Sequence, residues 1–334
     1  MKFIQQQLSK GTLYTLTVSE RFSIRLTSFG AAVRDITFFG KKMTCAPKED
    51  EAFLMAPDNY GKTVGPIAGR VRSAAFEVDG KTYRLPASPG PHCLHSGDLN
   101  FAYREFEAEI KESEDEISVV FHTFFPKKEG VYPADLGASV EYRVKRNEDR
   151  LYYKALVIPS SKAPISLVNH MYFNLGEKED ILSHTLFIDG EEVNAYDRDM
   201  IVTGKEKASL VLSFASPHRI GDHIEDPLLQ NTLLKGYDHA YHFAKTGIEK
   251  ANLILESEDF ALKLYTDAPA VQAYTTNYPH DNFPLDNGFL EKKYSSIALE
   301  PCLDTSDFNN LYIDPKKPYE INAIYAFLDK RPLR

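Results

Sequence analysis

The stretch LVNHMYFNL, residues 167–175, combines strand-forming residues with side chains that can hold or transfer protons. Its apolar and aromatic residues suit a pleated surface, yet it contains His170, Asn169 and Asn174. Burying such groups without partners costs about 1–3 kcal/mol each. Strand alternation places His170, Tyr172 and Asn174 on one face, and a purely packing face would not need them. Because a strand histidine is more often a hydrogen-bonded core residue than a catalyst, this stretch alone does not define a site.

A carboxylate occurs in a similar apolar setting near the end of the chain. The stretch SSIALEPCLD, residues 295–304, places Glu300 at the end of a predicted strand, just before Pro301. Alternation puts Ala298, Glu300 and Cys302 on one face, and the small neighbours leave room for a molecule to approach the carboxylate. A buried Glu is costly unless it is paired, hydrogen-bonded or functional. We favour function over a structural ion pair.

Two histidines lie in PGPHCLHSG, residues 89–97, among the Pro and Gly residues of a predicted loop or strand end. Alternation would place Cys93 and His95 on one side of the chain. A metal site is not expected, because no suitable third ligand lies close by. The alternative is that His92 is exposed to solvent and that His95 caps a turn. The cysteines next to these motifs are expected to be packing residues.

Two charged residues could bind hydroxyl groups. Asp238 follows a Gly-Tyr turn in KGYDHAYHF, although Asp commonly caps turns and this structural role stays open. Arg70 follows Gly69 in GPIAGRVRSAAF, and a guanidinium that enters a strand can pair with a carboxylate or bind hydroxyl oxygens. The alternative for Arg70 and for Arg72 is a paired, solvated surface charge.

The elements that must position these residues are predicted to be strands. Residues 76–85, FEVDGKTYRL, predict a hairpin with Asp79 and Gly80 in its turn. Few windows longer than about ten residues keep the apolar period of a surface helix. The pattern predicts an all-β protein, a large antiparallel β-sandwich. Long all-β chains often form one domain, and without a repeat or linker we expect residues 1–334 to be a single domain.

Composition excludes several classes of partner. Acidic residues outnumber basic ones by 48 to 39, a net charge of −9, and no basic stripe indicates a nucleic-acid partner. No window approaches the roughly 18 apolar residues of a membrane span, and the N-terminus lacks the apolar region of a secretory signal. Three widely spaced cysteines predict neither a disulfide framework nor a zinc site. We expect a cytoplasmic protein.

Taken together, these stretches resemble the aldose 1-epimerase (galactose mutarotase) family. The resemblance spans nearly the whole chain, and its pieces follow the family's order: GPIAGRV, FEVDGKTYRLP, LHSG, VYPADLGASVEY, NHMYFNL, GYDHAY, TDAPAVQAYT and ALEP. It implies a β-sandwich with an open sugar cleft, no metal or organic cofactor, and a small-molecule sugar as substrate. A homodimer remains possible.

The resemblance also implies roles, position by position. Glu300 of ALEP matches the family's general base, and His170 of NHMYFNL matches its general acid. The residues implied to hold the sugar are His95, Asp238, Arg70 and Gln272. Three positions depart from the family pattern: Pro66 and Gly69 replace an Arg and an Asn, and Ser96 replaces a Gly. These departures put fine substrate preference in doubt.

The implied reaction interconverts the α and β anomers of a free aldohexose such as galactose or glucose. A base takes the C1 hydroxyl proton while an acid protonates the ring oxygen, and the roles reverse when the ring closes. Alternatives are a glycoside hydrolase that uses Asp238 and Glu300 as paired carboxylates, and a non-catalytic sugar-binding or sensing protein. An epimerase of a hexose 6-phosphate or a disaccharide is a further alternative, although no cluster of Arg and Lys predicts a phosphate site.

Overall fold

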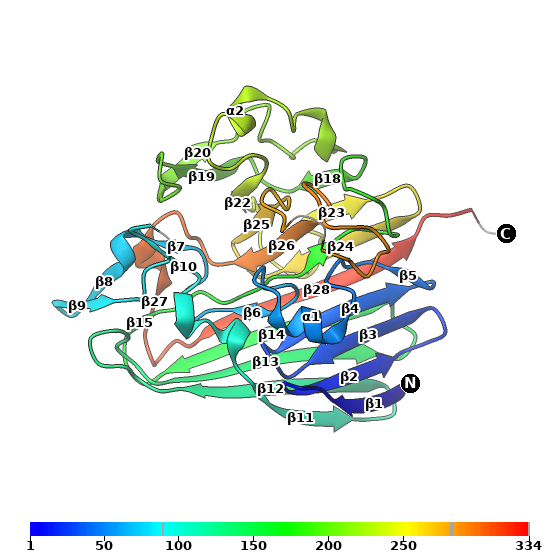
Figure 1. Cartoon of the computed structure of the whole chain (residues 1–334), viewed down its shortest axis with the longest axis horizontal. Helices are drawn as coiled ribbons and strands as arrows, with labels where there is room; N and C mark the ends of the chain where they lie inside the picture. Colours follow the sequence, from blue (N-terminus) through cyan, green and yellow to red (C-terminus); the bar gives the residue numbers. More distant parts are fainter. Residues whose placement is uncertain (89, 281–282, 333–334) are drawn as a thin grey trace.

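The structure is a computed structural model that describes residues 1–88, 90–280 and 283–332. Three antiparallel sheets of nine, six and five strands dominate it (Figure 1). The described helices and single turns of helix are short: α1 (Asp50–Met55), α2 (Pro227–Gln230), η1 (Arg72–Ala74), η2 (Gly97–Leu99), η3 (Phe101–Tyr103), η4 (Ile220–Asp222) and η5 (Phe308–Leu311). Within the described ranges, none of the helices has the length and apolar character needed to cross a membrane.

The spatial order of the strands departs from their order in the chain in the two larger sheets. The nine-stranded sheet runs from β11 (Glu107–Glu112) through β12 (Glu116–Phe125), β13 (Leu136–Lys145), β14 (Arg150–Pro159), β28 (Tyr319–Asp329), β24 (Phe260–Thr266), β23 (Leu253–Glu256) and β18 (Thr185–Ile188) to β21 (His218–Arg219). The six-stranded sheet runs from β17 (Tyr172–Phe173) through β26 (Ile297–Cys302), β25 (Ala270–Tyr274), β22 (Asp238–His242) and β19 (Glu192–Tyr196) to β20 (Val202–Lys207). The five-stranded sheet consists of β1 (Lys2–Gln7), β2 (Thr12–Thr17), β3 (Phe22–Thr27), β4 (Ala32–Phe38) and β5 (Lys41–Lys42). Short strand pairs are β6 (Thr63–Val64) with β16 (Val168–Asn169), β7 (Arg70–Val71) with β10 (Cys93–Leu94), β8 (Ala75–Val78) with β9 (Lys81–Arg84), and β15 (Ala163–Pro164) with β27 (Tyr312–Ile313).

The five-stranded sheet packs on the nine-stranded sheet. The ring centroid of Tyr14 on β2 lies 5.7 Å from that of Phe121 on β12. The ring of Phe22 on β3 lies at the same distance from that of Phe327 on β28. Figure 1 shows the blue strands β2–β4 in front of the green strands β12–β14. Two antiparallel sheets with inward-facing apolar side chains form a sandwich, so the predicted fold class is confirmed.

The six-stranded sheet contributes one of its faces to the same core. Val271 on β25 and Leu299 on β26 are fully buried in the apolar cluster that also contains residues of the other two sheets. The ring of Phe173 on β17 lies 5.9 Å from the ring of Tyr325 on β28. Since side chains alternate along a strand, the residues next to Val271 and Leu299 point to the opposite face. That opposite face carries the candidate site.

The predicted hairpin is confirmed. Strands β8 and β9 are joined by Asp79 and Gly80, whose φ angles are 50° and 75°. Positive φ at both central residues is the geometry that a tight turn between twisted strands requires.

The stretch 167–175 is not the continuous strand that its composition predicts. It contains β16 and β17, and His170 lies in the gap between them. The His170 N–H donates to Lys62 O at 2.9 Å, and His170 O accepts from the N–H of Gly61 at 2.8 Å. The chain changes partners at this point, from β6 to β26. The side chains of Val168, His170 and Tyr172 still point to one side across this gap, as the alternation predicts, since all three line one cavity.

Candidate active site

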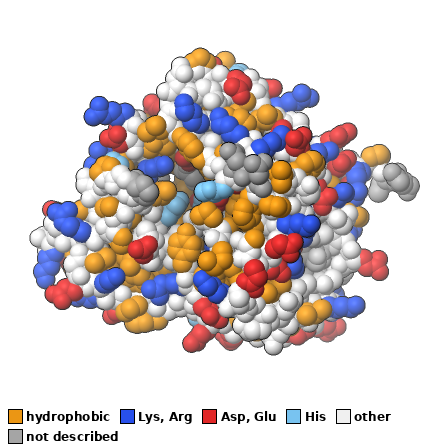
Figure 2. Space-filling view, in the orientation of Figure 1, with side chains coloured by type: hydrophobic (Ala, Val, Ile, Leu, Met, Phe, Trp, Pro, Cys, Tyr) orange, Lys and Arg blue, Asp and Glu red, His pale blue; other side chains and the backbone are white. Residues whose placement is uncertain are grey.

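A cavity of about 690 Å³ opens on the free face of the six-stranded sheet. All of the residues that the sequence assigns to catalysis or sugar binding line it: Arg70, His95, His170, Asp238, Gln272 and Glu300. Figure 2 shows this side of the molecule, with histidine side chains in pale blue near its hollowed centre. Small-molecule sites typically have volumes of about 300–1,000 Å³, so the cavity has the size of a ligand site.

Three neighbouring strands bring the acidic and amide side chains together. Gln272 on β25 and Glu300 on β26 are direct partners in the antiparallel register. Asp238 begins β22, on the other side of β25, where it is paired with Tyr274. Because residues two apart on a strand share a face, all these side chains point to the cavity. Glu300 lies inside β26 and not at its end, since the strand continues to Cys302.

His170 and Glu300 form a buried pair. His170 Nε2 lies 3.4 Å from Glu300 Oε1, and both side chains are more than nine-tenths buried. The register explains the contact, because Tyr172 on β17 is paired with Ala298 on β26. Continuing that antiparallel pattern by two residues places His170 opposite Glu300. The ring of Tyr172 lies 4.9 Å from the imidazole and packs against it.

Burial dominates the protonation of this pair. It raises the pKa of the Glu300 carboxyl well above its usual range, and the charge of Asp238 adds to the rise. It lowers the pKa of His170 to about 4. Burial therefore favours the uncharged form of the pair, in which a single proton lies on the carboxyl group and the imidazole is neutral.

Asp238 is oriented by an amide and faces a free guanidinium. Gln272 Nε2 donates to Asp238 Oδ1 at 2.6 Å. Burial raises the pKa of Asp238, while Arg70 and the Gln272 hydrogen bond oppose the rise. Arg72 pairs with Asp197 at 2.9 Å, whereas Arg70 has no ion-pair partner among the described residues. The Arg70 guanidinium is therefore available to hydroxyl oxygens in the cavity.

His95 is held in one tautomer by the backbone of Gly69. The N–H of Gly69 donates to His95 Nδ1 at 3.2 Å, and the N–H of His95 donates to Gly69 O at 2.9 Å. Burial lowers the pKa of His95 to about 3, with further contributions from His170 and Arg70. The imidazole is therefore neutral. Because Nδ1 accepts a hydrogen bond, its proton lies on Nε2, which can donate to a ligand oxygen.

The departures from the family pattern have local physical reasons. Gly69 has a φ of +83°, in the left-handed region that Gly and Asn tolerate, and no atom lies within 4 Å of where its Cβ would be. This part of the cavity wall is therefore open. Ser96 is buried, and its Oγ accepts from Ile67 N–H at 2.9 Å and donates to Ile67 O at 3.1 Å. Ser96 thus binds the backbone of Ile67, which directly follows the cis peptide bond between Gly65 and Pro66.

The asparagines of the first motif have structural partners. Asn169 Nδ2 donates to Gly61 O, and Asn174 Nδ2 donates to Ser295 O, each at 2.8 Å. Neither side chain lines the cavity, and His92 also lies outside its lining.

The cavity wall also contains polar residues to which sequence reasoning assigned no role, among them Asp58, Tyr172, Tyr274 and His280. Alternation placed Tyr172 on the face of His170, and the same rule would have placed Tyr274 on the face of Gln272. The aspartate and the histidine come from separate loops. No local pattern distinguishes them from ordinary surface residues.

Gly61 supports the backbone beside His170. Its φ is +62°, and a Cβ there would lie 1.9 Å from Val33 O. We expect Gly61→Ala to lower the free energy of unfolding by about 2–5 kcal/mol, of which about 1–2 comes from the left-handed conformation and about 1–3 from overpacking. Denaturant unfolding measures this change. Gly40→Ala is the matched control, because Gly40 has a φ of +75° but no atom within 4 Å of its Cβ position. Equal losses in the two variants would contradict the role of the Val33 contact.

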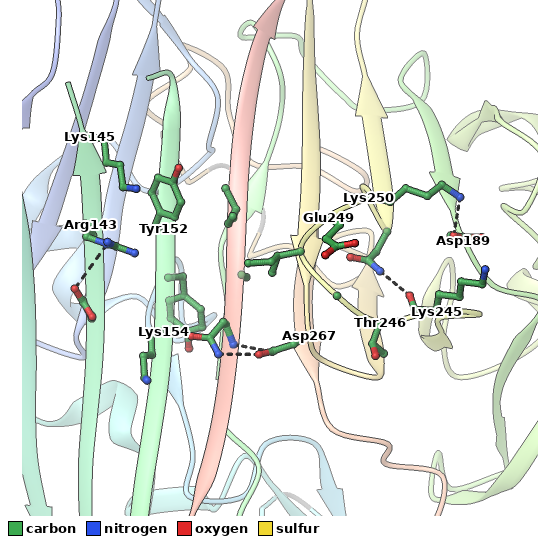
Figure 3. Close-up of a pocket in the computed structure, with 18 residues that line it drawn as sticks. Arg143, Lys145, Tyr152, Lys154, Asp189, Lys245, Thr246, Glu249, Lys250 and Asp267 are labelled. Carbon is green, nitrogen blue, oxygen red and sulfur yellow. Dashed lines mark hydrogen bonds and ion pairs between the residues drawn. The ribbon is translucent and has the colours of Figure 1, made fainter. Parts of the chain in front are cut away.

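A second cavity, of about 870 Å³, lies against outward-facing residues of β13, β14 and β28 (Figure 3). Some of its polar side chains bond to one another: Lys250 Nζ lies 3.1 Å from Asp189 Oδ2, and Asn322 Nδ2 donates to Asp267 Oδ2 at 2.7 Å. No histidine or cysteine is among its described lining residues. Because this cavity contains none of the residues assigned to catalysis or sugar binding, we place the candidate active site in the first cavity.

Metal ligation is not indicated in either cavity. No cluster of three or more His, Cys, Asp or Glu side chains in the described ranges has an arrangement that could hold a metal ion. The three cysteines, Cys45, Cys93 and Cys302, are buried and form no disulfide.

Comparison with known proteins defines the class. Residues 12–302 match the family described as aldose 1-epimerase. The chain therefore belongs to the aldose 1-epimerase family and is an enzyme of the isomerase class.

Individual relatives are similar over much of the chain. Galactose mutarotase of Rattus norvegicus is 26% identical over 311 residues, which cover 90% of this chain and 86% of the relative. Aldose 1-epimerase of Escherichia coli (strain K12) is 31% identical over 226 residues, which cover 65% of this chain and 63% of the relative. The crystal structure of galactose 1-epimerase from Lactobacillus acidophilus NCFM has a TM-score of 0.87 at 21% identity and covers 99% of both chains. That structural likeness shows a shared fold.

Proposed function

We propose that this protein interconverts the α and β anomers of a free aldohexose, galactose or glucose, by general acid–base catalysis. The observation that carries the proposal is the buried contact of 3.4 Å between His170 Nε2 and Glu300 Oε1 inside a ligand-sized cavity. The relatives named galactose mutarotase support galactose as a substrate.

In the proposed mechanism, Glu300 takes the proton of the C1 hydroxyl while His170 protonates the ring oxygen. The bond between C1 and the ring oxygen breaks, and the open-chain aldehyde rotates about C1–C2. On closure, Glu300 returns a proton to the carbonyl oxygen, and His170 takes one from the hydroxyl that attacks C1. Each positioned acid or base typically contributes about 10²–10⁴-fold to such a rate.

The proton count of the buried pair fits this cycle. Ring opening starts from ionised Glu300 and protonated His170, and it ends with protonated Glu300 and neutral His170. The uncharged state that burial favours is therefore the state that accompanies the open-chain sugar. Both states contain one proton, so the pair can serve ring opening and closure without changing its total charge.

The remaining polar residues are proposed to hold the sugar. Arg70 and the Nε2–H of His95 are donors, and Asp238 is an acceptor held by Gln272. Such contacts place the reacting atoms in line with the acid and the base.

The pair predicts a broad pH plateau for kcat/KM. Activity requires one proton on the pair. On the acid side it falls when the pair gains a second proton, which binds His170 near its lowered pKa of about 4. On the alkaline side it falls when Glu300 loses its proton, well above the usual carboxyl range. Polarimetry across this range, with circular dichroism to confirm folding, measures the profile. An acid limb near the ordinary imidazole pKa of about 6.5 would contradict the assignment.

The direct test of the function is polarimetry of freshly dissolved α-D-galactose and α-D-glucose. The protein should accelerate the decay of optical rotation without changing its final value, because a catalyst leaves the equilibrium between anomers unchanged. No acceleration with either sugar would overturn the proposal and favour a sugar-binding role.

A disaccharide with a free reducing end is a second candidate substrate. The cavity extends to the rings of Phe76, Phe308 and Tyr312. The Phe308 ring lies 6.1 Å from that of Phe76 and 5.7 Å from that of Tyr312, and together they give an apolar surface for a second sugar ring. Comparing kcat/KM for maltose and glucose separates the two candidates.

A further inference from the structure

Asp58 and His280 meet in the wall of the catalytic cavity. Asp58 Oδ2 lies 3.2 Å from His280 Nε2, and both residues line the cavity. About a quarter of the Asp58 side chain is exposed. The contact with His280 occupies one carboxylate oxygen, and Oδ1 has no partner in the described part of the protein. A carboxylate oxygen at a cavity wall is a strong acceptor for hydroxyl groups.

Further bonds fix the two loops that carry this pair. The buried carboxylate of Glu291 accepts a hydrogen bond from the hydroxyl of Tyr60, close to Asp58 in the chain. The other oxygen of Glu291 accepts from the backbone N–H of His280 at 2.8 Å. The Asp58–His280 contact is therefore a built arrangement and not a chance pairing of two surface side chains.

Asp58 is also connected to the catalytic residues. The hydroxyl of Tyr172 donates to the backbone oxygen of Asp58 at 3.3 Å, while the ring of Tyr172 packs on His170. Burial raises the pKa of Tyr172, and Asp58 and Glu300 both add to that rise. Burial likewise raises the pKa of Tyr274, with further contributions from Asp238 and Asp58. The charge of Asp58 therefore acts on Tyr172 together with that of Glu300, and on Tyr274 together with that of Asp238.

We propose that Asp58, oriented by His280, is a specificity-determining residue that accepts a hydrogen bond from a sugar hydroxyl remote from the anomeric carbon. The inference rests on the proposed function, because His170 and Glu300 fix the anomeric end of the sugar. Tyr172 lies between that end and Asp58, so the hydroxyl in question belongs to another part of the ring. A site built to bind a hydroxyl rejects analogues that lack it, because its polar group is then left unpaired.

The test measures KM and kcat by polarimetry at slightly alkaline pH. The substrates are galactose, glucose and deoxyhexoses that each lack one ring hydroxyl. The variants are Asp58→Asn and His280→Gln. Glu109→Gln is the matched control, since the exposed side chain of Glu109 on β11 pairs with that of His122 on β12 at 3.6 Å, outside the cavity. Wild-type protein and Glu300→Gln are included to test the proposed function in the same experiment.

We expect Asp58→Asn to raise KM for the preferred hexose about tenfold or more, as a hydrogen bond to a charged group implies, with little change in kcat. One deoxyhexose should show similar KM values with wild-type protein and with Asp58→Asn, because it lacks the bound hydroxyl. His280→Gln should give a smaller rise with the same dependence on that hydroxyl, and Glu109→Gln should resemble wild type.

Unchanged KM in Asp58→Asn, or an equal rise for every deoxyhexose, would overturn the role of Asp58. An inactive wild-type protein would instead overturn the proposed function. A large fall in kcat for Asp58→Asn with KM unchanged would also contradict the inference, since it would indicate a role in the chemical step.

Discussion

Glu300→Gln is expected to lower kcat for α-D-galactose roughly 10²–10⁴-fold while the protein stays folded. Glutamine keeps the size of the side chain and its hydrogen-bonding atoms, but it cannot take the proton of the C1 hydroxyl. The buried site gives solvent little access to replace the lost base. Polarimetry measures the activity, and denaturant unfolding measures the stability.

Stability is expected to be retained in this variant, because the sign of the pKa shift favours it. The folded-state pKa of Glu300 is raised, so the carboxyl stabilises the fold fully only below its unfolded pKa of about 4.3, and this contribution is lost as pH rises through the folded pKa. Below the folded-state pKa, glutamine replaces an uncharged carboxyl group and therefore costs the fold little.

Asp35→Asn is the matched control for a buried carboxylate. Burial raises the pKa of Asp35, but Arg25 and Lys42 outweigh this effect and hold the pKa below its usual value. The substitution removes the buried carboxylate from both cations, although Arg25 keeps Asp50 at 3.5 Å, and it should cost about 3–5 kcal/mol of stability, with activity per folded molecule retained. Wild-type activity in Glu300→Gln would refute the assigned base, as would equal activity losses in the two variants.

His170→Asn should reduce kcat to a similar degree, roughly 10²–10⁴-fold, because the ring oxygen then lacks a proton donor. The double variant with Glu300→Gln should be about as slow as either single variant, since residues that act as a unit give strongly non-additive effects. Single-variant losses that multiply in the double variant would show that the two groups act independently.

His184→Asn is the control for a buried histidine. Burial lowers the pKa of His184 to about 4, as it does for His170, but His184 accepts a hydrogen bond from the N–H of Leu175 at 3.1 Å and lies outside the cavity lining. We expect this variant to lose stability and to retain its activity per folded molecule. A loss of activity per folded molecule equal to that of His170→Asn would contradict a specific role of His170 in the reaction.

Local alternation was enough to predict which faces the main site residues occupy. The period of two placed His170 with Tyr172, and Glu300 with Cys302, and these groups do line one cavity. The roles of acid and base came from the resemblance to a family, since periodicity says nothing about chemistry. The break at His170 was missed because it depends on backbone partners, Lys62 and Gly61, which are distant in sequence.

Long-range pairings account for the rest of what sequence reasoning could not supply. The alignment of Gln272 with Glu300 depends on the register between β25 and β26, which the whole sheet sets. The Asp58–His280 contact joins two loops of unremarkable composition, so no spacing predicts it. The tautomer of His95 depends on one backbone N–H, that of Gly69, whose position follows only from the folded loop.

A buried pair that keeps one proton through the cycle would also separate the proposed reaction from its surroundings. In water, an anomeric sugar exchanges its ring form with the help of whatever acids and bases are dissolved nearby. In this cavity a catalytic cycle would begin and end with the same number of protons on Glu300 and His170, so it would draw none from the medium. The rate of anomer exchange would then be set by the protein itself and not by the buffering capacity of the solution around it.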